Sequence, residues 1–121
     1  MKGLGVDAVD IERFRRSLER TPTMRERLFV PEELDYVTPK VDPVPSLAAR
    51  FAAREATMKA LGLGLGAFGF HEVWVRRAAS GVPSLVVTGR AAELAAEHEV
   101  SGWWLSLSHT DTVAIAVVAA L

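Results

Sequence analysis

Residues 46–64, SLAARFAAREATMKALGLG, are the stretch that decides the fold of this chain. They predict a helix from Leu47 to Leu61 that is capped by Ser46 and ended by the glycines that begin at Gly62. At about 100° per residue, the bulky apolar side chains gather on one side of this helix and the alanines on the opposite side. A helix that is apolar on both sides packs on both sides, so we expect it to be central.

Five segments around this helix show the patterns of strands, in which side chains alternate between two faces. Two of them flank a turn at Ser80-Gly81 and are predicted to form a hairpin, with Pro83 placed at the start of a strand. The last two are joined by a short turn at residues 109–112. The predicted strands are residues 4–9, 72–76, 84–88, 103–108 and 113–119.

Three shorter helices are predicted beside the central one, at residues 11–20, 31–37 and 90–98. Prolines crowd the segment before the central helix, and residues 36–46 are predicted to form an exposed, mobile loop. This order of helices and strands predicts the α+β class, with a mainly antiparallel sheet packed against the long central helix.

The composition indicates one folded domain over residues 1–121, because 50% of the residues are hydrophobic and 24% are charged. A net charge of −1 argues against a protein that coats nucleic acid. The absence of cysteine excludes disulfides and cysteine-bound zinc and predicts a cytoplasmic protein. Asp7 and Asp10 stand where a signal peptide needs apolar residues, and the longest apolar run, residues 113–121, is too short to span a bilayer. We therefore expect neither nucleic acid nor membrane as a partner.

Glu55 and Lys59 are the charged residues that stand out in the predicted central helix. Their i, i+4 spacing is typical of an exposed ion pair worth about 0.2–0.5 kcal/mol. The helical angle of Glu55, however, lies near the bulky apolar side around Phe51, where a carboxylate without a partner costs several kcal/mol. A buried Glu55 would need a cation, which either Lys59 or a metal ion could supply.

Asp7 raises the same question, because it interrupts the first predicted strand, where aspartate is disfavoured. It is either a residue at a strand end or cap, or a second functional carboxylate. Two carboxylates without cysteine suit Mg²⁺, which proteins hold through one or two carboxylates and substrate phosphates. Zinc is poorly supported, because His71, His98 and His109 show no ligand spacing. His109 follows a predicted strand, and it is either a turn residue or a phosphate contact.

A stripe of arginines marks the predicted helix at residues 11–20. Arg13, Arg16 and Arg20 are spaced i, i+3, i+7 and lie away from the apolar side of this helix. Six arginines against three glutamates give residues 11–27 a local charge of +3, in a chain whose net charge is −1. The stripe is either a solvated face or a docking surface for an acidic partner.

Five motifs, in this order along the chain, resemble those of the holo-[acyl-carrier-protein] synthases, the small 4′-phosphopantetheinyl transferases. GVDAVDIERF at residues 5–14 and RLFVPEELDY at residues 27–36 precede SLAARFAAREATMKALGLG. A Gly-x-Pro hairpin at residues 81–83 and LSLSHTDTVAIAVV at residues 105–118 follow it. The resemblance therefore spans nearly the whole chain and implies the 4′-phosphopantetheinyl transferase fold.

The resemblance also implies an activity, the transfer of 4′-phosphopantetheine from coenzyme A to a serine of apo acyl carrier protein in fatty acid biosynthesis, with release of adenosine 3′,5′-bisphosphate. It implies a homotrimer with sites between protomers. Asp7 and Glu55 would bind Mg²⁺ and would act with Lys59 as the catalytic residues. Arg13 and its stripe would dock the carrier. The residues implied to bind coenzyme A are Arg50, Lys59, Gly62, Gly81, Pro83, Ser108, His109 and Thr110.

Two residues depart from the family pattern. Arg54 stands where lysine usually precedes the metal-binding glutamate, and arginine differs from lysine in reach and hydrogen-bond geometry. His71 stands where aspartate is usual, which leaves the role of that acid open. The serine proton would pass to Glu55 either directly or through a metal-bound water. A Mg²⁺-dependent phosphohydrolase of coenzyme A or a nucleotide and a non-catalytic trimeric interaction module are the alternatives.

Overall fold

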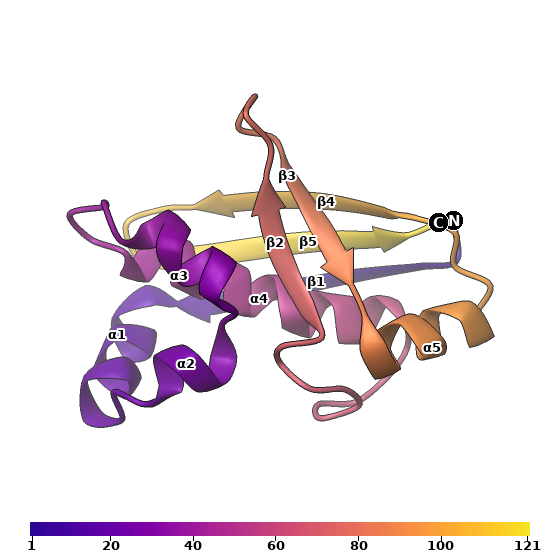
Figure 1. Ribbon diagram of the computed structural model, residues 1–121, viewed down its shortest axis with the longest axis horizontal. Coiled ribbons are helices and arrows are strands. Elements are labelled where there is room, and N and C mark those ends of the chain that lie inside the picture. Colours follow the sequence, from indigo (N-terminus) through magenta and orange to yellow (C-terminus); the bar gives the residue numbers. More distant parts are fainter.

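A computed structural model describes all 121 residues and contains ten helices and strands (Figure 1). Their order confirms the predicted α+β class, with one more short helix than expected. The elements are β1 (Gly3–Asp10), α1 (Ile11–Arg20), α2 (Met24–Leu28), α3 (Pro31–Val37), α4 (Val44–Ala60), β2 (Val73–Arg77), β3 (Pro83–Val87), α5 (Gly89–Glu97), β4 (Trp103–His109) and β5 (Val113–Ala120).

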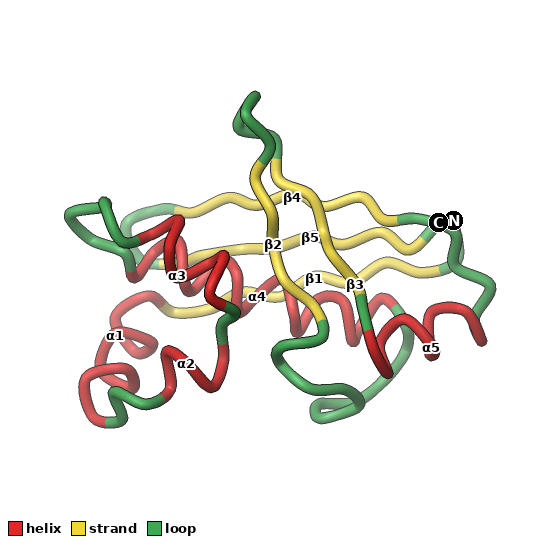
Figure 2. Tube along the Cα trace, in the orientation of Figure 1, coloured by secondary structure: helices red, strands yellow, loops and turns green.

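The strands form two antiparallel sheets. One has three strands in the order β1-β5-β4, and the other is the β2-β3 hairpin. Figure 2 shows the hairpin running across the direction of the three longer strands. The two chain ends lie side by side, since Gly3 of β1 pairs with Ala120 of β5 (Figure 1). No helix is long and apolar enough to cross a membrane.

Helix α4 is the centre of the fold, as its two apolar sides predict. Its first turns pack against α1, α2 and α3, its alanines pack against β5, and its last turns pack against β2 and α5. Strand β1 approaches the helix so closely that a Cβ atom built at Gly5 would lie 1.9 Å from the carbonyl oxygen of Ala56. Only glycine fits at such a contact, so Gly5 sets the distance between β1 and α4.

The start of α4 differs from the prediction. The helix begins at Val44, after Pro43, and not after a cap at Ser46. The carbonyl oxygen of Ser46 instead accepts a hydrogen bond from Arg50 Nη1 at 3.2 Å. Because proline has no N–H group to satisfy, Pro43 fits the N-cap position and Pro45 fits the first turn of the helix. The cluster of prolines had instead suggested a loop.

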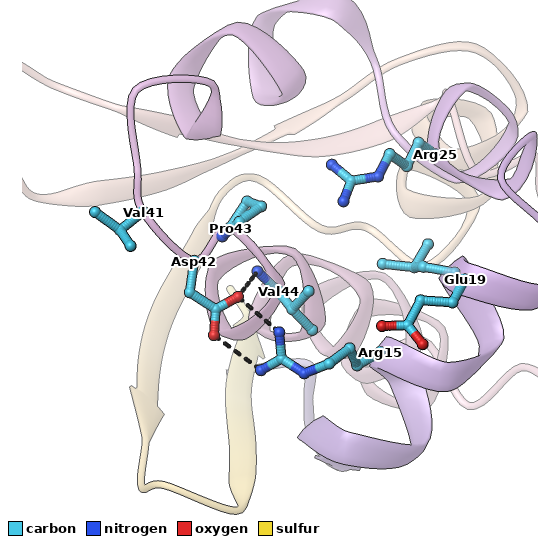
Figure 3. Close-up of a pocket in the computed structure, with 8 residues that line it drawn as sticks. Arg15, Glu19, Arg25, Val41, Asp42, Pro43 and Val44 are labelled. Atoms are coloured by element: carbon cyan, nitrogen blue, oxygen red, sulfur yellow. Dashed lines mark hydrogen bonds and ion pairs between the residues drawn. The ribbon is translucent and has the colours of Figure 1, made fainter.

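The predicted loop over residues 36–46 is therefore too long, and only residues 38–43 connect α3 and α4. This connection is exposed, but it is anchored at Asp42 (Figure 3). The Asp42 carboxylate accepts two hydrogen bonds from the Arg15 guanidinium of α1, at 2.9 and 2.8 Å, and one from the backbone N–H of Val44. These contacts lower the pKa of Asp42 and fix the loop to α1.

Further elements differ from the prediction. Helix α2 lies in five residues that were expected to be irregular, and β2, β3 and α5 are each shifted by one residue from the predicted range. Glu72 lies outside β2 and accepts hydrogen bonds from the N–H groups of Gly69, Arg90 and Ala91, which lower its pKa. Glu72 thus caps the first turn of α5 from a distant part of the chain.

Helix α3 is joined to α4 by a fully buried ion pair. Arg54 Nη1 and Nη2 donate to the two carboxylate oxygens of Glu33, at 2.9 and 2.5 Å. Arg54 also donates to the carbonyl oxygens of Phe70 and Arg50, and Glu33 accepts the N–H of Val75 in β2 at 3.1 Å. The fork geometry of arginine is what allows these contacts, so the departure from lysine at this position has a structural role.

Candidate active site

A pocket of about 530 Å³ lies between β1, α1 and α4. It is lined by Asp7, Glu55 and Lys59, the three residues that were expected to be catalytic, and by Arg13 of the arginine stripe. Apolar side chains complete the wall, among them Phe51. The fold therefore gathers these residues from three separate elements into one cavity.

Glu55 is the buried carboxylate of this pocket. It is only 8% exposed, and its Oε2 atom has no hydrogen-bond partner. Burial raises its pKa, the nearby charge of Asp7 raises it further, and Lys59 partly opposes the shift. A buried carboxylate oxygen without a partner is costly, so Glu55 is suited to receive either a proton or a cation.

Lys59 does not form the exposed pair with Glu55 that its spacing allowed. Its ammonium group binds Asp7 Oδ1 at 3.1 Å and the carbonyl oxygen of Val6 at 3.0 Å. The close approach of β1 to α4 at Gly5 brings both acceptors within reach of the lysine. About half of the Lys59 side chain stays exposed, and the residue lines the pocket.

The donor set of this pocket fits a hard cation. Asp7 and Glu55 supply carboxylate oxygens, the Oε2 atom of Glu55 has no hydrogen-bond partner, and the charge of Asp7 raises the pKa of Glu55. No group of three or more histidine, aspartate and glutamate side chains is arranged so that it could hold a metal ion by itself. Two carboxylates suit Mg²⁺, which keeps several coordination positions for water and substrate phosphates.

A second, smaller pocket of about 150 Å³ brings together Arg50, Ser108 and His109, which were expected to contact coenzyme A. Arg50 is 1% exposed, and its Nε atom has no hydrogen-bond partner. Burial lowers its pKa, while the charge of Glu33 partly opposes that shift. A buried guanidinium with a free N–H donor is a binding group for an anion.

Tyr36, Lys40 and Arg77 also line this second pocket, and none of them was predicted from the sequence. They come from the end of α3, from the loop after it and from the end of β2. The sequence signal was weak, because basic residues at helix and strand ends are common and only the fold brings these three together.

The two pockets lie apart. Asp7 belongs to β1 and His109 to β4, which are the opposite edges of the three-stranded sheet. Arg50 and Glu55 are both on α4, but at about 100° per residue they point in directions roughly 140° apart. The two pockets of one chain therefore share no lining residue and stay separate.

Four expected coenzyme-binding residues line neither pocket. Gly62 has a positive φ of 70° just after α4, and Gly81 has a φ of 86° in the hairpin turn. The carbonyl oxygen of Gly81 accepts a hydrogen bond from Arg77 Nη1 at 2.6 Å, which links this turn to the second pocket. Pro83 begins β3, and the Thr110 hydroxyl accepts N–H groups within its own turn.

The expected docking stripe is exposed. Arg13, Arg16 and Arg20 form no ion pair, whereas Arg15, between them in the sequence, is bound to Glu12 and Asp42. Arg13 also lines the pocket of Asp7 and Glu55. The stripe thus carries unpaired positive charge to the edge of the candidate active site.

His71 stands where the family usually has aspartate. Its ring contacts the carbonyl oxygen of Glu26, and it lines neither pocket.

Comparison with known proteins defines the class. The family model of the 4′-phosphopantetheinyl transferase superfamily matches residues 3–118, and the chain belongs to this superfamily. The chain is 50% identical over 119 residues to a holo-[acyl-carrier-protein] synthase of Streptomyces griseus, covering 98% of this chain and 96% of the relative. This similarity confirms the family resemblance that the sequence motifs indicated.

Solved structures agree with this assignment. The fold is similar to the crystal structure of holo-[acyl-carrier-protein] synthase from Neisseria meningitidis, with a TM-score of 0.90 and 32% identity over 100% of this chain and 98% of that chain. It is also similar to the Helicobacter pylori enzyme in complex with coenzyme A, with a TM-score of 0.82 and 26% identity over 98% and 99% of the two chains.

Proposed function

We propose that this chain transfers 4′-phosphopantetheine from coenzyme A to a serine hydroxyl of an apo acyl carrier protein. The products are the holo carrier protein and adenosine 3′,5′-bisphosphate, and the reaction belongs to fatty acid biosynthesis. The observation that carries the proposal is the buried Glu55, whose free Oε2 lies in one pocket with Asp7 and Lys59. The similarity to holo-[acyl-carrier-protein] synthases over 98% of the chain supports the choice of substrates.

Glu55 is the proton acceptor in this proposal. The serine oxygen attacks the phosphorus that carries the pantetheine arm, and the bond from that phosphorus to the bridging oxygen breaks. The serine proton passes to Glu55, which is buried beside Asp7 and Lys59 and has a free Oε2 atom. The bridging oxygen leaves on adenosine 3′,5′-bisphosphate, and the ammonium group of Lys59 stabilises the negative charge that develops there.

Asp7 and Glu55 would hold the Mg²⁺ ion. When bound, the ion would supply positive charge for the pyrophosphate oxygens, which carry more charge as the bond breaks. Lys59 already neutralises part of the charge of Asp7, at 3.1 Å, and keeps that carboxylate oriented toward the pocket.

The second pocket would hold phosphate of coenzyme A. Arg50 supplies a buried donor without a partner, and Ser108 and His109 line the same cavity. Since the two pockets lie at opposite sheet edges, a complete site would need two chains. A ring of identical chains can place the β1 edge of one beside the β4 edge of the next.

The exposed face of the three-stranded sheet supports such a homotrimer. Helix α4 covers one face, while the other presents Leu4, Val6, Trp104 and Val117, which are 37–69% exposed. Strand pairing aligns these side chains in adjacent rows across β1, β5 and β4. An apolar patch of this kind is typical of an interface between protein chains.

The chain has no cysteine, which suits a reducing compartment, so we propose that the enzyme acts in the cytoplasm.

The test is the mass of an apo carrier protein after incubation with the protein, coenzyme A and Mg²⁺. We expect the carrier to gain the mass of one phosphopantetheine, and we expect Glu55→Gln, Asp7→Ala and a chelator each to abolish the gain. Breakdown of coenzyme A without a carrier would instead favour a phosphohydrolase. Carrier modification that survives both substitutions would exclude the proposed roles of the two carboxylates.

The assembly is tested by sedimentation at micromolar concentration. We expect a trimer, and a charged substitution at Trp104 on the exposed sheet face should give monomers without activity. A wild-type protein that sediments only as a monomer would contradict a site shared between chains.

A further inference from the structure

Three cations surround one aromatic ring in the second pocket. The Arg50 guanidinium carbon lies 4.5 Å from the centre of the Tyr36 ring, the Lys40 ammonium nitrogen 5.2 Å, and the Arg77 guanidinium carbon 5.8 Å. Each distance is within the range of a cation–π interaction. The three cations come from the α3–α4 loop, from α4 and from the end of β2, so the ring is where three parts of the fold meet.

None of these cations has an acidic partner. Lys40, Arg50 and Arg77 take part in no ion pair. Glu33, the acid whose charge acts on Arg50, gives both carboxylate oxygens to Arg54. Like charges that share a small cavity repel each other, and the face of the Tyr36 ring is the one group with a negative potential that all three cations contact.

The cluster is thus incomplete without an anion. Arg50 is buried with a free Nε–H, and Ser108 and His109 add polar groups to the lining of the cavity. A phosphomonoester carries close to two negative charges and three acceptor oxygens, which matches three converging cations better than a singly charged diester does. Coenzyme A has one phosphomonoester, on its ribose.

We propose that Tyr36 is a positioning residue that holds Lys40, Arg50 and Arg77 in one cluster and thereby sets the preference of the enzyme for coenzyme A over its dephosphorylated form. The inference rests on the proposed function, because it takes coenzyme A as the co-substrate. Tyr36 itself does not need to touch the phosphate. Its ring lowers the repulsion between the cations before the anion arrives, and preorganised binding groups bind more tightly.

The test compares Tyr36→Leu with Tyr36→Phe in direct calorimetric binding of coenzyme A and dephospho-coenzyme A. Tyr36→Phe keeps the ring and should keep the wild-type preference for coenzyme A over dephospho-coenzyme A. Tyr36→Leu should weaken coenzyme A binding about tenfold, which corresponds to about 1.4 kcal/mol, and should change binding of the dephosphorylated ligand less than about twofold. Equal weakening toward both ligands would mean a structural role and would overturn the proposal.

Two neighbouring arginines of β2 provide a matched control. Arg77 reaches the Tyr36 ring, whereas Arg76 is bound to Glu32 on the other side of the strand. Arg77→Gln should reduce the preference for coenzyme A, and Arg76→Gln, with the same change of charge, should not. Equal effects of the two substitutions would mean that the preference for coenzyme A comes from long-range electrostatics and not from the cluster, which would overturn the proposal. This pair also keeps the proposal testable if Tyr36→Leu does not fold.

Binding and turnover separate this proposal from the proposed function. If the wild type binds coenzyme A tenfold or more tightly than its dephosphorylated form but modifies no carrier protein, the transferase assignment fails and the Tyr36 comparison still stands. If the carrier is modified while Tyr36→Leu keeps the wild-type preference, the role of Tyr36 fails and the transferase assignment stands.

Discussion

The buried ion pair between Glu33 and Arg54 allows a sharp test of how α3 and α4 are held together. We predict that Glu33→Gln, which keeps the size of the side chain and removes its charge, strongly destabilises the protein. In the wild type each carboxylate oxygen accepts two hydrogen bonds, Oε1 from Val30 N–H and Arg54 Nη2, and Oε2 from Val75 N–H and Arg54 Nη1.

The magnitude follows from this arrangement. Whichever oxygen becomes the amide nitrogen of glutamine, that nitrogen faces one donor of Arg54 and one backbone N–H donor, and both lose their acceptor. The Arg54 charge also stays buried without a counter-charge, since its side chain is 0% exposed. Removing one partner of a buried ion pair costs about 3–5 kcal/mol.

The assay is urea unfolding at a fixed protein concentration. With a slope of roughly 1–3 kcal/mol per M, a loss of about 4 kcal/mol moves the midpoint down by more than about 1 M. The double variant Glu33→Leu/Arg54→Leu removes both charges. Its loss of unfolding free energy should therefore be smaller than the summed losses of the single variants Glu33→Leu and Arg54→Leu. A Glu33→Gln protein within about 1 kcal/mol of the wild type would refute the reasoning.

Three further predictions concern the β1–α4 contact, the catalytic carboxylate and the docking stripe. Gly5→Ala should destabilise the fold by about 3 kcal/mol, because the new Cβ meets the Ala56 carbonyl oxygen at 1.9 Å, whereas Gly64→Ala, in open space, should change the melting temperature little. Because the pKa of Glu55 is raised above its ordinary value of 4.5, its ionised form costs stability, so Glu55→Gln should raise the melting temperature at pH 7 in chelator. That gain should shrink to nothing as the pH falls below 4.5, and a constant gain at all pH values would contradict the burial argument. Arg13→Glu should raise the KM for the carrier protein far more than the KM for coenzyme A, and equal increases would argue against docking on α1.

Local pattern was sufficient for most of the elements. The alanine and glycine sequence around α4 predicted a helix buried on two sides, and the last segments predicted two strands joined by a short turn, which are β4 and β5. The errors lie where a long-range contact overrides local signals. Two prolines that suggested a loop begin α4, and Glu72, assigned to a strand, caps α5 instead.

The sequence by itself determined which residues could be functional, because Asp7 and Glu55 stand in apolar elements where a carboxylate is costly. Only the tertiary structure decided their partners. Lys59 lies four residues from Glu55 but binds Asp7, since the glycine contact brings β1 against α4. The Tyr36 cluster has no sequence signature either. Its cations come from three elements, and periodicity reports the faces of one element but not the distances between several.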